Sequence, residues 1–477
     1  MNRKLHLILA FMAATLFVGI MAVPSMAATV VEGPTPIFEG AATADNDLTM
    51  YNDKIALSFA VGTNNYWNMT RGSVLDIGIN DGQNNFKQDL TNDSEFLLDL
   101  WTSTGSYKGE NLLTDVDAKY SVDGDTAKVV MKTRYWVADA DKNGKDDEKE
   151  YGTVQKPLNV TTTYTLKDGD SFVTMVTTVE NPAGNKVTYK NMYSGYSIST
   201  NAASMYGPFG FYPEVKTTGI AVGANEKVQE RFGEFVATYS DSYTASVQMD
   251  DADSYKGSSG YKDVYKLRNI APGHTEKYTG ELLVSDKSET ASIISRYIAR
   301  ENIKDASKLS GTVTDDSGKP VAGAYVIVEK TGVYMPTEKS QSVNGQAVGT
   351  PVANMMPFVW TRTDENGKYS FDLPNTGWND GTENVLGNGD YTYKLKVEAS
   401  GYTSLLTDEI KLTGDKTEDL KIEQGAHIHL KATDQKGNAI PFKIQISGIT
   451  AEMKTLGGAV QFSDAFASSN DLDFNLS

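Results

Sequence analysis

Twelve consecutive residues, 139–150, carry oxygen-bearing side chains at a spacing that suits a divalent cation. Counted from Asp139, ligand-type side chains stand at positions 1, 3, 5, 9 and 12, a glycine stands at position 6, and position 7 can offer its main-chain carbonyl. This complete pattern predicts a calcium-binding loop, and the alternative is a solvated acidic loop tip. The six predicted ligands are Asp139, Asp141, Asn143, Lys145, Asp147 and Glu150.

The charge of this segment favours a bound ion over the solvated tip. Six acidic residues face three lysines within residues 139–150, a local net charge of 3 − 6 = −3, and such a segment repels itself unless a cation enters it. Residues 133–137 before the loop are typical of a strand, and residues 151–154 after it are expected to begin another. We therefore expect Ca²⁺ as a structural cofactor on a β-hairpin, without the paired helices of an EF-hand.

Histidine and cysteine give little further material for chemistry. The 477 residues include 4 His and no Cys, and no arrangement of catalytic residues is recognisable. His427 and His429 stand two apart, so a strand would place both on one face, but a metal site also needs a third ligand. Two histidines on the polar face of a strand are therefore the favoured interpretation, and His274, in a turn-like segment, is expected to be exposed.

Aromatic side chains form a second group of candidate binding residues. Some lie on the Gly- and Pro-rich segment 206–213, and others stand near polar Asn and Thr. Flat rings held on stiff loops can stack on the apolar face of a pyranose, so a polysaccharide or cell-surface glycan is a candidate partner. The alternative is that such rings fill sheet edges and core corners. The residues are Tyr66, Trp67, Trp101, Tyr206, Phe209 and Tyr212.

The N-terminal residues 1–27 predict an export signal. Arg3 and Lys4 give a basic start, residues 5–23 are nearly all apolar, and Ser-Met-Ala at 25–27 is a small-residue cleavage pattern. The alternative is an uncleaved anchor, because the apolar run approaches spanning length. We expect a secreted, extracellular protein with no membrane association after cleavage. The remaining charge of 42 − 62 = −20 makes nucleic acid an unsuitable partner.

Most of the chain follows a two-residue period, which is typical of antiparallel strands with one wet face. Residues 29–285 have this texture without a long helix, and the Asp-Gly pair within 167–170 predicts a hairpin turn. Asp286 followed by Glu289 resembles a capping box, and the apolar spacing after it predicts a helix near 288–302. We expect this helix to link two domains and to pack against a sandwich.

Three sequence blocks follow in a fixed order: L-S-G-T-V-T-D-D-S-G-K-P-V-A-G-A at 309–324, T-R-T-D-E-N-G-K-Y-S-F at 361–371, and V-E-A-S-G-Y at 397–402. Together they resemble the carboxypeptidase regulatory-like domain over about residues 308–423. The resemblance implies a small transthyretin-like sandwich that is non-catalytic and acts as a spacer, folding support or binding module in secreted proteins.

Turn residues accompany this resemblance. The pattern Thr-Asp-x-x-Gly occurs three times, with its aspartate at Asp315, Asp364 and Asp434. Each copy predicts a turn between two strands, because Asp can bond the backbone two residues on while Gly takes a positive φ. Two inserts, 330–359 and 375–389, are longer than the family's usual loops and are candidates for a function that the family does not predict.

The last stretch, 424–477, begins like a further copy of the small sandwich and stops while its residues still alternate, which suggests the front portion of a longer chain. More weakly, the whole layout is similar to the N-terminal region of secreted bacterial metallohydrolases of the PHP superfamily. That resemblance implies a metal-dependent catalytic domain beyond Ser477. The family's His-rich metal motif is absent from this sequence, so no catalytic role is carried over to any residue.

These observations predict an all-β protein of tandem antiparallel β-sandwiches, one large, one small and transthyretin-like, and one partial, with a single short linker helix. We expect a secreted, multidomain, non-catalytic binding or scaffold region that calcium stabilises. The alternatives are the N-terminal part of an extracellular PHP-type hydrolase and a carbohydrate-binding N-terminal sandwich. The expected divisions are a signal peptide at 1–27, the large sandwich with its calcium loop at 29–285, the linker helix at 286–307, the regulatory-like domain at 308–423 and a partial Ig-like sandwich at 424–477.

Overall fold

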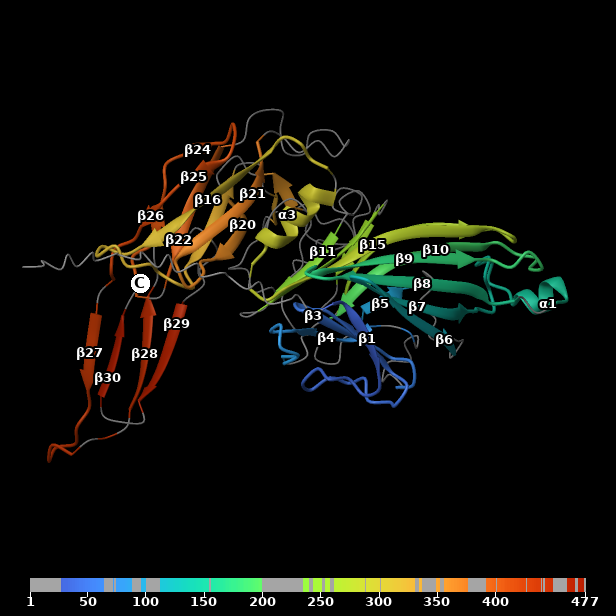
Figure 1. Ribbon diagram of the computed structural model, residues 1–477, viewed down its shortest axis with the longest axis horizontal. Helices are drawn as coiled ribbons and strands as arrows, with labels where there is room; N and C mark the ends of the chain where they lie inside the picture. The colour runs from blue at the N-terminus through green and yellow to red at the C-terminus, as the bar shows by residue number, and fades with distance from the viewer. Residues whose placement is uncertain are drawn as a thin grey trace, which may run out of the picture.

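The computed structural model is built mostly of antiparallel β-sheets (Figure 1). Two helices occur among the described residues, α1 (Asp147–Tyr151) and α3 (Ala291–Arg300). The predicted all-β class with several sandwich-like units is therefore confirmed, and α1 is an addition to the one predicted helix. The described residues are 27–63, 72, 74–87, 96–99, 112–153, 156–199, 235–239, 243–250, 254–257, 261–287, 289–300, 302–330, 334–336, 349–351, 356–375, 392–399, 401–425, 427–438, 440, 442–448, 461–467 and 471–475.

Two large sheets make up the first sandwich. The 8-stranded sheet contains, in spatial order, β1 (Thr29–Glu32), β2 (Leu48–Tyr51), β3 (Ile55–Phe59), β4 (Val74–Ile79), β5 (Phe96–Asp99), β10 (Tyr189–Ser199), β14 (Tyr261–Ile270) and β13 (Ser254–Gly257). The 7-stranded sheet contains, in spatial order, β11 (Phe235–Tyr239), β12 (Thr244–Met249), β15 (Thr275–Ser285), β9 (Phe172–Glu180), β8 (Leu158–Lys167), β7 (Thr126–Tyr135) and β6 (Leu112–Asp123).

Aromatic contacts join the inner faces of these two sheets. The rings of Phe59 in β3 and Tyr164 in β8 are 4.8 Å apart between centroids, and those of Tyr196 in β10 and Tyr278 in β15 are 5.4 Å apart. Buried and less buried residues alternate along β8 and β9, so each strand has one face in the core between the sheets. The predicted hairpin turn joins these two strands, with Gly169 at a φ of 67°.

Helix α3 lies between the first sandwich and the second (Figure 1). On the first sandwich, Arg296 donates from Nε to Oε2 of Glu281 in β15 at 2.6 Å, and its guanidinium carbon lies 3.7 Å from the centre of the Phe172 ring. Toward the second, the helix packs on β20 (Met356–Arg362) and β21 (Lys368–Pro374). The buried residues of the helix are Ala291, Ile293, Ile294, Tyr297 and Ile298. The helix therefore belongs to the packing of both sandwiches, beyond the single one predicted.

The start of α3 differs from the prediction. The helix begins two residues after Glu289, so the capping box predicted from Asp286 and Glu289 is wrong. Glu289 instead accepts hydrogen bonds from Ser285 Oγ at 2.9 Å and from Thr361 Oγ1 at 2.5 Å. Thr361 belongs to the second sandwich, so the carboxylate that resembled a cap fastens the linker to that sandwich.

The second sandwich pairs two smaller sheets. One contains β21 (Lys368–Pro374), β16 (Ala306–Thr314), β25 (Lys416–Thr417) and β26 (Leu420–Lys421), and β25 and β26 run parallel to β16. The other contains β20 (Met356–Arg362), β17 (Tyr325–Lys330), β22 (Thr392–Glu398), β23 (Leu405–Leu406) and β24 (Ile410–Lys411). Buried Trp360, Phe371 and Tyr393 are among its largest core side chains. Within the insert at 330–359, β18 (Tyr334–Pro336) pairs with β19 (Gly349–Pro351).

Two two-stranded ribbons follow the second sandwich (Figure 1). Strand β27 (His427–Lys431) pairs with β30 (Asp471–Asn475), and β28 (Phe442–Gly448) pairs with β29 (Gln461–Ala467). The first ribbon thus joins the beginning of this region to its end.

The three predicted Thr-Asp-x-x-Gly turns are confirmed. In each, the Oδ1 atom of Asp315, Asp364 or Asp434 accepts hydrogen bonds from backbone amides two and four residues on. The glycines have φ values of 82°, 72° and 82°. Each turn lies between two strands.

We expect the first of these turns to lose its contribution to the stability of the fold in acid. Hydrogen bonds from the Ser317 hydroxyl and from the Lys319 amide hold the pKa of Asp315 below its ordinary value of 3.8. Because the folded pKa is depressed, the contribution to stability is present above pH 3.8 and is lost as the pH falls through the folded pKa. We expect Ser317→Ala to raise the pKa of Asp315 in an NMR titration. An unchanged pKa would contradict this assignment.

Among the described residues, no helix has the length and apolar character needed to cross a membrane. The predicted signal peptide, except for Ala27, lies outside these residues, so export stays a prediction.

Candidate metal site

The predicted calcium loop connects β7 to β8. These antiparallel strands pair from Thr126 with Lys167 to Tyr135 with Leu158, so the loop stands on a β-hairpin, as predicted. Its second half differs, because the chain forms the short helix α1 there. The strand predicted over 151–154 is therefore wrong at residues 151–153, which form the end of α1 and a bend, and residue 154 lies outside the described residues. The Asp146 side chain caps α1 by accepting a hydrogen bond from the backbone amide three residues on.

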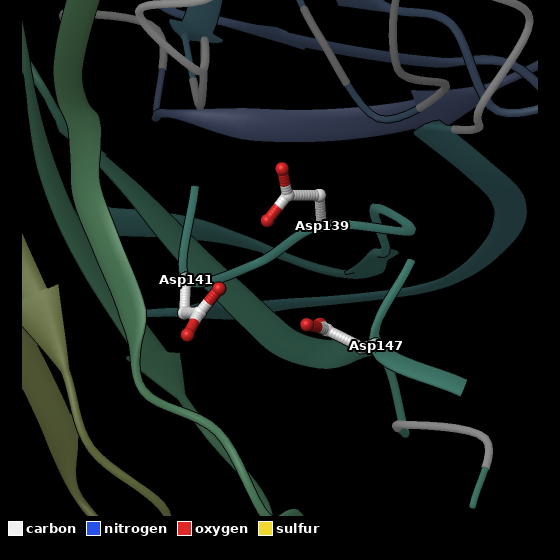
Figure 2. A group of neighbouring side chains, drawn as sticks. All are labelled: Asp139, Asp141 and Asp147. Atoms are coloured by element: carbon white, nitrogen blue, oxygen red, sulfur yellow. The ribbon is translucent and has the colours of Figure 1, made fainter. Parts of the chain in front are cut away.

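Three carboxylates of the loop point toward one another (Figure 2). One oxygen from each of Asp139, Asp141 and Asp147 lies within 4.8 Å of the other two. Because Ca²⁺ binds oxygen at about 2.3–2.6 Å, two oxygens on one ion are at most about 5 Å apart. The three aspartates therefore stand at a separation that a single ion can bridge.

Asp147 is the least exposed member of this group. Its relative exposure is 2%, and its Oδ2 accepts a hydrogen bond from the Ala140 amide at 3.0 Å. Its Oδ1 is buried and has no hydrogen-bond partner among the described residues. Burial raises the pKa of the Asp147 carboxyl above its ordinary value, and the charges of Asp141, Asp139 and Glu150 raise it further. Among the described residues, the two oxygens of this carboxylate thus receive one hydrogen bond between them.

Backbone amides hold the first half of the loop in place. The Oδ1 and Oδ2 atoms of Asp139 accept hydrogen bonds from the amides of Asn143 at 3.1 Å and Gly144 at 2.9 Å. The turn needs Gly144, whose φ is 86°, a conformation that few other residues adopt. The glycine at position 6 of the pattern thus bends the chain so that Asp139 and Asp141 face Asp147.

The other three predicted ligands lie beside this group. The Asn143 side-chain amide donates to Oε2 of Glu150 at 2.7 Å, and Lys145 Nζ is 3.4 Å from Oε1 of the same carboxylate. Oδ1 of Asn143 accepts a hydrogen bond from the Lys145 amide at 2.9 Å. Of the six predicted ligands, the structure thus brings three aspartates together and pairs the remaining three with one another.

Strand β10 fastens the loop to the opposite sheet. The Lys190 amide donates to the Ala140 carbonyl at 2.8 Å, and Lys142 Nζ donates to the Asn191 carbonyl at 2.7 Å. Lys190 Nζ also lies 3.8 Å from Oδ2 of Asp141. Sequence reasoning missed Lys190 and Asn191 because they lie far along the chain and carry no motif.

The other residues singled out in the sequence give little further support for a binding site. All six aromatic residues predicted to bind a glycan lie outside the described residues. His274 is exposed, as predicted, in the turn between β14 and β15.

A cavity of about 510 Å³ lies beside the linker, and its lining includes Glu289, Asp364 and Asp419. Each of these carboxylates already accepts hydrogen bonds from neighbouring residues, so it has a structural partner.

Comparisons with known proteins do not place the chain in a family. No protein-family model and no curated protein matches it. Among solved structures, it is similar to a galactose 1-epimerase from Lactobacillus acidophilus NCFM, with 11% identity, a TM-score of 0.27, and coverage of 55% of this chain and 100% of that one.

Two further solved structures show the same weak similarity. A protein of glycosyl hydrolase family 38 from Enterococcus faecalis has 12% identity, a TM-score of 0.37, and coverage of 66% and 43% of the two chains. A 3-chlorocatechol 1,2-dioxygenase from Rhodococcus opacus 1CP has 16% identity and a TM-score of 0.17, and the match covers 25% of this chain and 60% of the dioxygenase. These likenesses are too weak to support any inference about function.

Proposed function

We propose that this chain is a secreted, non-catalytic binding or scaffold region whose first sandwich is stabilised by Ca²⁺. The observation that carries the proposal is the buried Asp147 Oδ1, which has no hydrogen-bond partner among the described residues and belongs to a group of three carboxylates. Export is supported by the basic, apolar and small-residue pattern of residues 1–27.

A cation would stabilise the Asp147 carboxylate, whose Oδ1 has no hydrogen-bond partner among the described residues. Burying an unpaired charge costs roughly several kcal/mol of free energy. The carboxylates of Asp139 and Asp141, within 4.8 Å, add electrostatic repulsion. The nearest ion pairs do not reach Asp147, because Lys190 lies against Asp141 and Lys145 against Glu150. A divalent ion at the centre of the group would supply Oδ1 with its missing partner and remove the repulsion.

The ligand chemistry favours Ca²⁺ among divalent ions. The group offers carboxylate oxygens alone, without the imidazole or thiolate ligands that Zn²⁺ prefers. Mg²⁺ demands a strict octahedron and usually keeps several waters, whereas Ca²⁺ accepts irregular sets of six to eight oxygens. A turn-rich loop with a carboxylate, an amide and a carbonyl nearby suits the less demanding ion.

A bound ion would act on the fold rather than on a substrate. The loop stands at the end of the β7–β8 hairpin and is hydrogen-bonded to β10 of the opposite sheet. Ordering the loop would therefore hold the two sheets together at this end. Extracellular calcium sites are typically weak, at about 10⁻⁴ to 10⁻³ M, which suits a structural role in millimolar calcium.

The second sandwich is proposed as a carboxypeptidase regulatory-like module. Its two small sheets and its Gly367 turn, which leads from β20 of one sheet to β21 of the other, support this reading. The glycan-binding alternative rests on residues outside the described part of the chain, and the PHP-hydrolase alternative rests on sequence layout. Both stay predictions.

Calorimetric titration of Ca²⁺ into the full chain tests the proposal. We expect one ion to bind per molecule, and Asp139→Ala to abolish the heat because it removes one of the three gathered carboxylates. Glu148→Gln is the matched control, since it removes one negative charge from the same loop at an exposed residue outside the group. Equal heats for the wild type and Asp139→Ala would contradict the calcium site, and equal losses in both variants would reduce it to a general charge effect.

A further inference from the structure

The cavity of about 510 Å³ beside the linker has one wall formed by the outer face of the sheet that contains β21, β16 and β25. Ser310 in β16 stands opposite Ser370 in β21 and Thr417 in β25. Thr312, two residues further along β16, stands opposite Lys368. Because opposite residues share a face of a sheet, four hydroxyls and one ammonium group line this wall. Among the described residues, none of the four hydroxyls has a hydrogen-bond partner.

Three cationic side chains line the same cavity, those of Lys287, Arg362 and Lys368, and none of them forms an ion pair within the described part of the chain. Tyr325 fixes the Arg362 guanidinium, because its hydroxyl accepts a hydrogen bond from Nη2 and its ring centre lies 4.2 Å from the guanidinium carbon. The buried Nε of Arg362 has no hydrogen-bond partner among the described residues. No described carboxylate therefore neutralises these three charges.

Three carboxylates, those of Glu289, Asp364 and Asp419, complete the charged lining. Oδ1 of Asp364 accepts a hydrogen bond from the Lys368 amide at 2.8 Å, and Oδ1 of Asp419 accepts one from the Thr312 amide at 3.0 Å. The Oδ2 atoms of both aspartates have no hydrogen-bond partner in the part of the chain that the structure describes. Each aspartate is thus held by one oxygen and can accept from a ligand with the other.

We propose that this cavity binds a neutral saccharide. The formal charge of its lining is 3 − 3 = 0, so a charged ligand of either sign meets repulsion from three like charges without a net attraction. An apolar ligand would desolvate these charged groups without giving them partners. The hydroxyls of a sugar both donate and accept, so they can donate to the carboxylates and accept from the cations at the same time.

The size and the position of the cavity agree with such a ligand. Its volume lies within the range of about 300–1,000 Å³ that is typical of small-molecule sites. Lys287 and Glu289 belong to the linker, whereas the rest of the lining belongs to the second sandwich. A bound sugar would therefore contact both parts and hold the linker on this sandwich. This inference goes beyond the proposed calcium-stabilised scaffold and does not depend on the calcium loop or on the aromatic residues predicted to bind a glycan.

Amide chemical shifts of the full chain in saturating Ca²⁺ test this inference. The probes are soluble neutral oligosaccharides of glucose, galactose, mannose, xylose and N-acetylglucosamine, together with glucuronate and glucosamine as charged sugars. We expect at least one neutral oligosaccharide to shift the amides of Ser310, Thr312, Ser370 and Thr417 in a saturable manner. If none of the neutral probes shifts these amides, or if a charged sugar binds here more tightly than every neutral one, the proposal is overturned.

Two substitutions test the contacts with the strongest neutral probe. Ser370→Trp fills the cavity from an exposed strand position, where an aromatic residue is well tolerated, and should abolish binding. Asp419→Asn keeps the oxygen that accepts from the Thr312 amide but replaces Oδ2 with a donor, so we expect the affinity to fall about tenfold or more.

Lys319→Ala is the matched control, because it removes an exposed lysine of the same sandwich that does not line the cavity, and it should bind as the wild type does. Thermal unfolding shows which variants are folded. Wild-type affinity in folded Ser370→Trp would overturn the site. If that variant does not fold, wild-type affinity in Asp419→Asn has the same consequence.

Discussion

Replacing Asp147 with asparagine is expected to stabilise the calcium-free protein and to destabilise the protein in calcium. Without the ion, the change removes a buried charge that faces two other carboxylates and whose Oδ1 has no hydrogen-bond partner in the described part of the chain. The new amide can donate toward Asp139 or Asp141 while its oxygen still accepts from the Ala140 amide. We expect a gain of about 1–3 kcal/mol in the free energy of unfolding of the first sandwich in chelator.

In calcium, the order of the two proteins reverses. At one hundred times its dissociation constant, the ion adds about 2.7 kcal/mol to the wild type and little to Asp147→Asn, which lacks one ligating carboxylate. Thermal unfolding in chelator and in excess Ca²⁺ measures both arms, at roughly 2–4 °C per kcal/mol for a domain of this size. Glu148→Gln should follow the wild type in both solutions. An Asp147→Asn protein that is less stable in chelator as well would show that the carboxylate has a structural partner and needs no ion.

Local patterns predicted the strands well because the signal is short-range. Alternation along 158–167 and 172–180 depends on which face each residue turns to the core, and an Asp-Gly pair closes the hairpin between them. The capping box failed because a carboxylate three residues after an aspartate can bond many partners. Glu289 finds Thr361 in another sandwich, and no window of sequence contains that contact.

The prediction of the calcium loop likewise succeeded for residues close in the sequence and missed the contacts between distant ones. The motif in the sequence contains the glycine and all three gathered aspartates. It does not show that Asp147 begins helix α1 and is buried there, or that the Lys190 amide of β10 bonds the loop at Ala140. The register that sets His429 opposite Asp473 joins strands distant in the chain, so no window of sequence contains that pairing.

A buried carboxylate beside the 8-stranded sheet, that of Asp47, is the basis for a second prediction, a large loss of stability on substitution. Asp47 is 0% exposed and stands directly before β2. Its Oδ1 accepts hydrogen bonds from the amides of Val61 at 2.9 Å, Gly62 at 2.8 Å and Thr63 at 3.1 Å. Its Oδ2 accepts from the Ala44 amide at 2.9 Å and from the Thr63 hydroxyl. One side chain thus satisfies the amides where the chain leaves β3, a role for which the sequence shows no motif.

We expect Asp47→Asn to destabilise the first sandwich by more than about 3 kcal/mol, because an amide group replaces one accepting oxygen and faces N–H donors, which leaves buried donors unpaired. Urea unfolding should show a lower midpoint with an unchanged slope. Asp45→Asn, two residues earlier and exposed, is the matched control and should stay within about 0.5 kcal/mol of the wild type. The folded Asp47→Asn protein should still bind Ca²⁺ with wild-type affinity, since Asp47 is not part of the aspartate group. If Asp47→Asn were as stable as Asp45→Asn, the amides of 61–63 would be hydrogen-bonded by water as well as by this carboxylate, and the prediction would be wrong.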